Sequence, residues 1–224
     1  MSRANSQLKI AVLISGRGSN MQALANHAET PNASYQICLV AANKPADGLS
    51  IASDAGLSTA LIDRKSYTSK QDHERALAEA IEASGANWIC LAGYMSVLSA
   101  DFIARFEGRI INIHPSLLPD YKGLHTHERA LADSQKFHGV SVHLVTPVLD
   151  DGAVIAQMRL PVRSADTQES LSARVLVLEH ILYPMVIGSL ASGAVTLDAG
   201  QVCWQDISVA NALSLPEDTT LIFG

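Results

Sequence analysis

Apolar residues come first in short continuous runs along this chain and later in alternating ones. The continuous runs are rich in Ile, Val, Leu and Ala and are bounded by Gly, Pro, Asn or Ser. Such runs are typical of strands buried on both faces of a parallel sheet. Helical periods separate them, and Ser69 and Ser99 are expected N-caps. The pattern predicts strands at 8–14, 35–41, 57–62 and 88–92, with helices near 21–28, 49–55, 70–84 and 100–106.

The second half of the chain shows a different pattern. Residues 140–145 and 154–162 alternate between apolar and polar side chains, as antiparallel strands with two unlike faces do. A long helix is predicted at 170–190, with Pro184 inside it and a kink near Tyr183. The predicted fold class is therefore α/β, a doubly wound, mostly parallel, Rossmann-like sheet with an antiparallel C-terminal extension.

The chain contains no linker, repeat or low-complexity run, so we expect a single domain over residues 1–224. That domain consists of an N-terminal half of about 8–106, a C-terminal half of about 107–193 and a short tail.

The segment 109–119 is the strongest candidate for a functional strand end. A β-branched run ends at Pro115, and Asn112 and His114 lie two residues apart, so both side chains point to one face of the strand. The carboxyl ends of strands are where α/β sheets usually bind ligands. An isolated Asn and His are also common loop hydrogen bonders, so the case depends on the later histidines and on Asp150.

A glycine turn follows the first predicted strand, with the sequence Ser15-Gly16-Arg17-Gly18-Ser19-Asn20, and a helix begins after it. Backbone N–H groups at a helix start can bind a phosphate. Such a turn also allows a helix to pack close to its strand. The residues alone leave both readings open.

Composition narrows the class of protein. The net charge is −6 and the pI about 5.7, which gives no basic surface for nucleic acid or an anionic membrane. The N-terminal apolar run Ile10–Ile14 is too short for a signal peptide or a membrane span. The three cysteines are expected to be buried, reduced thiols. These features predict a cytoplasmic protein without nucleic-acid or membrane partners.

Five motifs follow one another along the chain. They are Ile14-Ser15-Gly16-Arg17-Gly18-Ser19-Asn20, Leu91-Ala92-Gly93-Tyr94-Met95, Ile111-Asn112-Ile113-His114-Pro115-Ser116-Leu117-Leu118-Pro119, Gly123-Leu124-His125-Thr126-His127, and Thr146 to Gly152 with Asp150. In this order they resemble the phosphoribosylglycinamide formyltransferases (glycinamide ribonucleotide transformylases), a branch of the folate-dependent formyltransferase family. The resemblance covers about Lys9 to Gly193. It implies a nucleotide-binding N-terminal half, about 8–106, and a folate-binding and catalytic C-terminal half, about 107–193.

The resemblance implies formyl transfer from 10-formyltetrahydrofolate, as co-substrate, to the amine of 5-phosphoribosylglycinamide in purine biosynthesis. It implies a catalytic set of Asn112 and His114, which face the developing oxyanion, and Asp150, which favours the imidazolium. The ribonucleotide would be bound by Gly18, Ser19, Asn20 and Glu179. The folate would be bound by Lys70, Met95, Ser96, Val97, Leu98 and Asn112.

Four positions depart from the family's pattern. Ser96 stands where many relatives have arginine, and Leu176 where a polar or basic residue is frequent. Lys122 and Asp151 replace a usual proline and glycine in loops. These departures put substrate affinities in question, rather than the reaction.

Other functions remain as alternatives. A 10-formyltetrahydrofolate deformylase would share Asn112 and His114, but such hydrolases lack the glycine turn and the His-Thr-His segment. A methionyl-tRNA formyltransferase would need a further domain and a basic surface. A non-catalytic folate- or nucleotide-binding regulator would be expected to have lost Asn112, His114 or Asp150.

No metal is expected, because His125 and His127 lack further ligands at a recognisable spacing. We expect a monomer or a homodimer.

Overall fold

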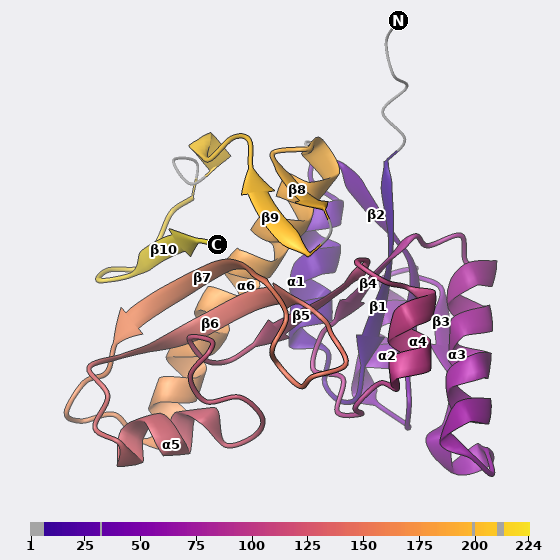
Figure 1. Cartoon of the computed structure of the whole chain (residues 1–224), viewed down its shortest axis with the longest axis horizontal. Coiled ribbons are helices and arrows are strands. Elements are labelled where there is room, and N and C mark those ends of the chain that lie inside the picture. Colours follow the sequence, from indigo (N-terminus) through magenta and orange to yellow (C-terminus); the bar gives the residue numbers. More distant parts are fainter. Residues whose placement is uncertain (1–6, 32, 199, 210–212) are drawn as a thin grey trace, which may run out of the picture. The chain divides into compact units, whose positions relative to one another are not determined.

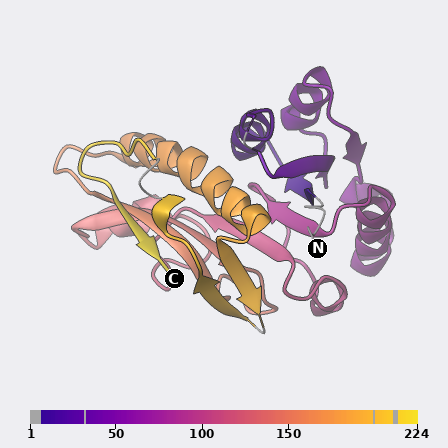
Figure 2. The same ribbon diagram turned by 90° about the horizontal axis from the view of Figure 1, so that it is seen from above.

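The computed structural model describes residues 7–31, 33–198, 200–209 and 213–224. It divides into two compact units, residues 1–98 and 99–224. The two are described separately below, and a single domain over the whole chain stays a prediction. Figures 1 and 2 show the elements along the chain.

The N-terminal unit is built on parallel strands in the order β4-β1-β2-β3. The chain adds β2 and β3 on one side of β1 and then returns to place β4 on the other side, which is the doubly wound pattern. The central strand β1 is buried along most of its length, as its apolar run predicts. The elements are β1 (Leu8–Ile14), α1 (Ser19–Ala28), β2 (Tyr35–Ala42), α2 (Asp47–Asp54), β3 (Thr59–Leu61), η1 (Arg64–Ser66), α3 (Lys70–Ala83) and β4 (Trp88–Leu91).

The C-terminal unit pairs its strands antiparallel, in the order β10-β7-β6-β5. The helix α6 packs on β6 and β7 (Figures 1 and 2). The tail adds β10 beside β7 and a separate hairpin of β8 and β9. The elements are α4 (Ala100–Arg105), β5 (Ile110–His114), α5 (Thr126–Ala132), β6 (Phe137–Leu144), β7 (Val154–Pro161), α6 (Gln168–Ser192), β8 (Val195–Asp198), β9 (Gln201–Trp204) and β10 (Thr220–Phe223).

The α/β fold class is confirmed, with a parallel part followed by an antiparallel part. The predicted caps are also confirmed, because the Ser69 hydroxyl accepts from the Asp72 amide and the Ser99 hydroxyl from the Phe102 amide. Three predictions need correction. The strand predicted at 57–62 is only Thr59–Leu61, β6 starts three residues earlier than predicted, and the helix α5 was not predicted.

The long helix α6 has the length and composition of a membrane span, and half of that apolar window is buried in the protein. Its packing on β6 and β7 is that of a core helix. The Tyr183 hydroxyl donates to the Ile111 carbonyl at 3.1 Å and so links α6 to β5. Pro184 lies within the helix as predicted, while the kink near Tyr183 stays a prediction.

The three cysteines are free thiols in the structure. Cys90 is buried, Cys38 is half-buried and Cys203 is exposed, so the expectation of buried thiols fails at Cys203.

Candidate functional site

Asn112 and His114 both lie on β5, two residues apart and therefore on one face of the strand. His114 is buried and Asn112 is half-buried. Asn112 is directly opposite His143 in the antiparallel register between β5 and β6. The Asn112 amide nitrogen and the His143 Nε2 lie 3.1 Å apart.

The partners of His143 define its protonation state. Its Nδ1 lies 2.7 Å from the Leu144 carbonyl, which only accepts, so Nδ1 carries the proton. Burial lowers the pKa of His143 below its ordinary value, which favours a neutral ring. The Nε2 of that ring then accepts from the Asn112 amide N–H. His143 therefore orients the Asn112 amide.

Asp150 faces both histidines from the turn between β6 and β7. Its carboxylate oxygens lie 3.5 Å from His114 Nδ1 and 3.6 Å from His143 Nε2, and its side chain is 8% exposed. The Gly123 amide donates to Asp150 Oδ2 at 2.9 Å. The structure thus brings Asn112, His114 and Asp150 together around His143.

The turn that carries Asp150 requires a glycine at its end. Asp150 itself adopts a left-handed backbone with φ of 50°. A Cβ atom on Gly152 would lie 1.8 Å from the Leu144 carbonyl oxygen. No side chain fits there without movement of β6, so Gly152 lets the turn close tightly enough to present Asp150.

The two ring nitrogens of His114 face different acceptors. Nε2 donates to the Tyr121 carbonyl at 3.0 Å, which fixes the orientation of the ring. Nδ1 lies 3.5 Å from Asp150, longer than an ordinary hydrogen bond. An imidazolium would donate to both acceptors, and Nδ1 has the longer of the two contacts.

A second histidine pair lies next to this set. His127 Nδ1 and His138 Nε2 are 3.1 Å apart, so one ring donates to the other and at least one is neutral. Burial, followed by the nearby charges of His127 and His114, lowers the pKa of His138 to about 4. His125 is exposed, and its Nδ1 lies 3.4 Å from the Glu128 carboxylate. Over the described ranges, no group of three His, Cys, Asp or Glu residues is placed to hold a metal ion.

The glycine turn of the N-terminal unit packs closely against its neighbours, and phosphate binding by it stays a prediction. Gly18 is the N-cap of α1, with φ of 73°, and a Cβ there would lie 3.2 Å from the Gly48 Cα. The turn therefore allows close packing against α2. The first turn of α1 has no acidic side chain, and Gly18 provides no side-chain cap. Ser19 and Asn20 follow at the start of this helix, a position favourable for an anion.

Ser15 connects the strand ends of the N-terminal unit. Its hydroxyl donates to Asn43 Oδ1 at 2.7 Å and accepts from the Met95 amide at 2.8 Å. Ser15, Asn43 and Met95 follow β1, β2 and β4, respectively. The hydroxyl thus links the glycine turn to the predicted folate loop, 95–98. Sequence reasoning placed Ser15 in a motif and assigned it no role, since only the folded strand order shows what it joins.

The predicted folate residues of this unit differ in exposure. Met95 and Val97 are 67% and 62% exposed, Ser96 is half-buried, and Leu98 is buried. Lys70 begins α3, and its ammonium lies 3.7 Å from Glu74. Burial, followed by the Glu74 charge, raises the pKa of Tyr94, which places Glu74 near the start of the loop.

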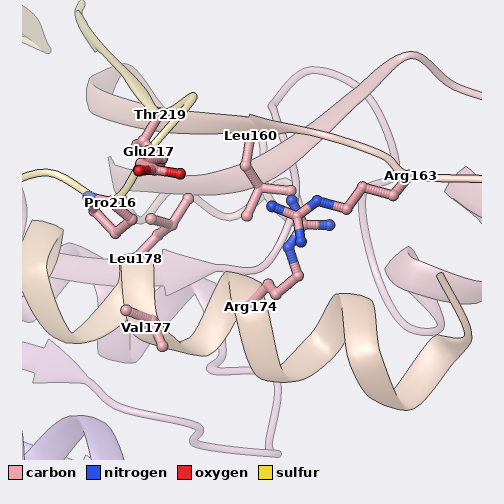
Figure 3. A pocket seen from close by; sticks show the side chains of 8 residues that line it. All are labelled: Leu160, Arg163, Arg174, Val177, Leu178, Pro216, Glu217 and Thr219. Carbon is pink, nitrogen blue, oxygen red and sulfur yellow. The ribbon is translucent and has the colours of Figure 1, made fainter. Parts of the chain in front are cut away.

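Glu179 lies on α6, half-buried, in the same unit as the catalytic set. That unit also contains a pocket of about 240 Å³, shown in Figure 3, to which both Arg163 and Arg174 contribute. None of the predicted site residues lines it. Its lining is Leu160, Arg163, Arg174, Val177, Leu178, Pro216, Glu217 and Thr219.

Comparison with known proteins gives consistent matches. The family model described as formyl transferase matches residues 8–187. The phosphoribosylglycinamide formyltransferase of Escherichia coli is 40% identical over 89% of this chain and 94% of its own length. The trifunctional purine biosynthetic protein adenosine-3 of Gallus gallus is 42% identical over 89% of this chain. The match covers only 20% of the length of that larger protein.

Solved structures agree with these relatives. The phosphoribosylglycinamide formyltransferase of Brucella melitensis is 46% identical, with a TM-score of 0.80 over 88% of this chain and 99% of that one. Glycinamide ribonucleotide transformylase 1 of Symbiobacterium toebii is 36% identical, with a TM-score of 0.86 over 91% of this chain and 96% of that one. The match to the family model covers well over half of the residues, and the chain therefore belongs to the formyl transferase family.

Proposed function

We propose that this protein transfers the formyl group of 10-formyltetrahydrofolate to the amino group of 5-phosphoribosylglycinamide, a step in purine biosynthesis. Family membership supports the reaction class, and the Escherichia coli relative of nearly equal length supports the substrates. The observation that carries the proposal is the arrangement of Asn112, His114 and Asp150 around one strand end.

The chemistry requires the groups that this strand end presents. The substrate amine attacks the formyl carbon, so a C–N bond forms and the carbonyl oxygen gains negative charge. The Asn112 amide and the His114 imidazolium act as donors to that oxygen. The bond to the folate nitrogen then breaks, and a proton moves from the attacking nitrogen to the leaving nitrogen. Asp150, beside His114 Nδ1, supports the charged imidazole during this transfer.

Each of the two substrates is assigned its own set of residues. We assign the ribonucleotide phosphate to Gly18, Ser19 and Asn20, because the start of α1 lacks both a side-chain cap and an acidic residue. Glu179 is assigned to the ribose hydroxyls. The folate is assigned to Asn112, to Lys70 and to Met95, Ser96, Val97 and Leu98, where exposed apolar side chains suit a planar pterin.

A two-substrate assay tests the proposal. Formyl transfer is followed by the absorbance change of the folate, with and without the ribonucleotide. The proposal expects turnover only when both are present. Turnover without the ribonucleotide would make the protein a deformylase. Tight binding of either substrate without turnover would make it a regulator.

The remaining parts of the proposal concern the protein's surroundings. We propose a cytoplasmic enzyme whose partners are these two small molecules, without a metal cofactor, and which acts as a monomer or a homodimer. Size measurement in solution, at several protein concentrations, tests the oligomeric state.

A further inference from the structure

Three consecutive residues of the loop between β5 and α5 contact the residues around the candidate catalytic set. The Tyr121 carbonyl accepts from His114 Nε2 at 3.0 Å, and the Gly123 amide donates to Asp150 Oδ2 at 2.9 Å. Between them, the Lys122 ammonium forms an ion pair with Asp151, the neighbour of Asp150. The ion pair is thus flanked by the two backbone contacts that orient His114 and Asp150.

The two partners of the ion pair lie 29 residues apart along the chain and meet as one contact in the fold. Neither position was assigned a role from the sequence.

The loop is anchored independently on its other side. The Arg129 guanidinium donates to the Lys122 carbonyl at 2.8 Å, and the Tyr121 hydroxyl donates to Asp133 at 2.9 Å. Arg129 also lies over the Tyr121 ring, at 5.1 Å from its centroid. Loss of the ion pair would therefore leave the loop attached to α5 and change only its approach to Asp150.

Backbone conformation increases the importance of the contact. Tyr121 and Asp150 both adopt left-handed conformations, with φ of 56° and 50°. A left-handed backbone is unfavourable for a residue with a side chain, and it persists where neighbouring contacts hold it. The Lys122–Asp151 pair joins the two strained segments.

We propose that Lys122 and Asp151 are positioning residues that fix the loop Tyr121–Gly123 against the Asp150 turn and thereby orient His114 and Asp150 for formyl transfer. This inference rests on the proposed function. The ion pair acts through the Tyr121 carbonyl and the Gly123 amide, and neither charged group needs to touch a substrate. Burial, the His114 charge and, after them, the Lys122 charge lower the pKa of His143, which agrees with the place of Lys122 beside the candidate set.

The expected effect is modest, because the two side chains are 35% and 51% exposed. We expect Lys122→Ala and Asp151→Ala each to lower kcat by about threefold to fivefold, with little change in either KM. The double variant should lose no more than one single variant, since both substitutions remove the same contact. Lys122→Arg should retain kcat. Lys136→Ala, an exposed lysine of the same unit, is the matched control and should match the wild type.

A second measurement does not depend on activity. Trypsin cleaves after Lys122 when the loop opens, and Asp151→Ala keeps that lysine while removing its partner. We expect faster cleavage at Lys122–Gly123 in Asp151→Ala than in the wild type, with cleavage after the exposed Arg163 as internal reference.

The outcomes separate the two proposals. Faster cleavage together with the lower kcat supports the positioning role. An active wild type with unchanged kcat in both single variants overturns that role, whether or not cleavage changes. A wild type without formyl transfer overturns the proposed function, and with it any positioning for that reaction. If trypsin cleaves Asp151→Ala no faster than the wild type, the ion pair does not hold the loop.

Discussion

The two units place their polar side chains differently. In the N-terminal unit the central strand is apolar and buried, and the candidate binding residues follow the strands, as Ser15 and Gly18 follow β1. In the C-terminal unit the polar residues lie within the strands, as do Asn112 and His143. Parallel strands covered on both faces leave polar groups only at their ends, whereas antiparallel strands can devote one face to them. The first unit is therefore suited to binding by loops and backbone, and the second to chemistry by side chains.

The largest expected effect tests the chemical part of this comparison. His114→Ala should lower kcat by about 10²- to 10³-fold, because it removes the proposed oxyanion donor and the partner of Asp150. Steady-state kinetics with both substrates measures it, with melting temperature as the control for folding. Near-normal turnover of the variant would remove His114 from the mechanism.

A pH-dependent loss of stability should also come from the C-terminal unit. Burial holds the pKa of His138 at about 4, while in the unfolded chain it is near 6.5. Folding favours the neutral form of His138. Its contribution to the free energy of unfolding is therefore complete above pH 6.5 and is lost as the pH falls towards 4. The loss should be about 3 kcal/mol. Urea unfolding at several pH values measures it, and His138→Gln should reduce the slope. Equal stability at both ends of this range would contradict the assignment.

Two buried serines allow a matched comparison of the units. Ser141 accepts from the Leu118 amide and the Gln157 amide and donates to the Ser116 carbonyl, at 3.0, 2.8 and 2.6 Å. Ser15 makes two such bonds. We expect Ser141→Ala to lower the free energy of unfolding by about 3 kcal/mol and Ser15→Ala by about 1.5 kcal/mol. Each substitution leaves the former partners of the hydroxyl without a hydrogen bond, and Ser141 has more of them.

Denaturant unfolding of both serine variants decides the point. A larger loss from Ser15→Ala would show that the strand ends of the parallel unit depend more on polar contacts than its apolar strands suggest. Ser134→Ala, an exposed position, is the control and should change little.

The smallest effect concerns binding by the loop region. Asn20→Ala should raise the KM of the ribonucleotide by about tenfold while kcat changes little. The contact it removes would be equally strong in the bound substrate and in the transition state, so its loss weakens binding and leaves the chemical step unchanged. An unchanged KM would exclude this helix start from the phosphate site. The KM of the folate substrate serves as the internal control.

The sequence predicted the parallel unit better than the arrangement of the candidate site. The apolar run 8–14 predicts β1 to the residue, because a strand buried on both faces leaves a continuous signal. The helix α5 gives no such signal, since only Thr126 and Ala130 of its residues are buried. It begins after His125, which is left-handed with φ of 59°.

The contact between Asn112 and His143 depends on strand register, which the sequence does not specify. A shift of one residue would turn His143 to the other face of the sheet. The register also shifts between Val142 and His143 in the pairing of β6 with β7. The residue types of the candidate set were therefore predictable, while the neutral histidine that orients Asn112 required the fold.

Gly152 limits how the Asp150 turn can diverge. A β-carbon on Gly152 would lie 1.8 Å from the Leu144 carbonyl oxygen, so no other residue fits at position 152 without movement of the backbone. Asp151, one residue earlier, is half exposed and accepts a charged side chain. Variation among related proteins in this turn should therefore concentrate at 151, where a change can alter the opposing loop without displacing the carboxylate beside it.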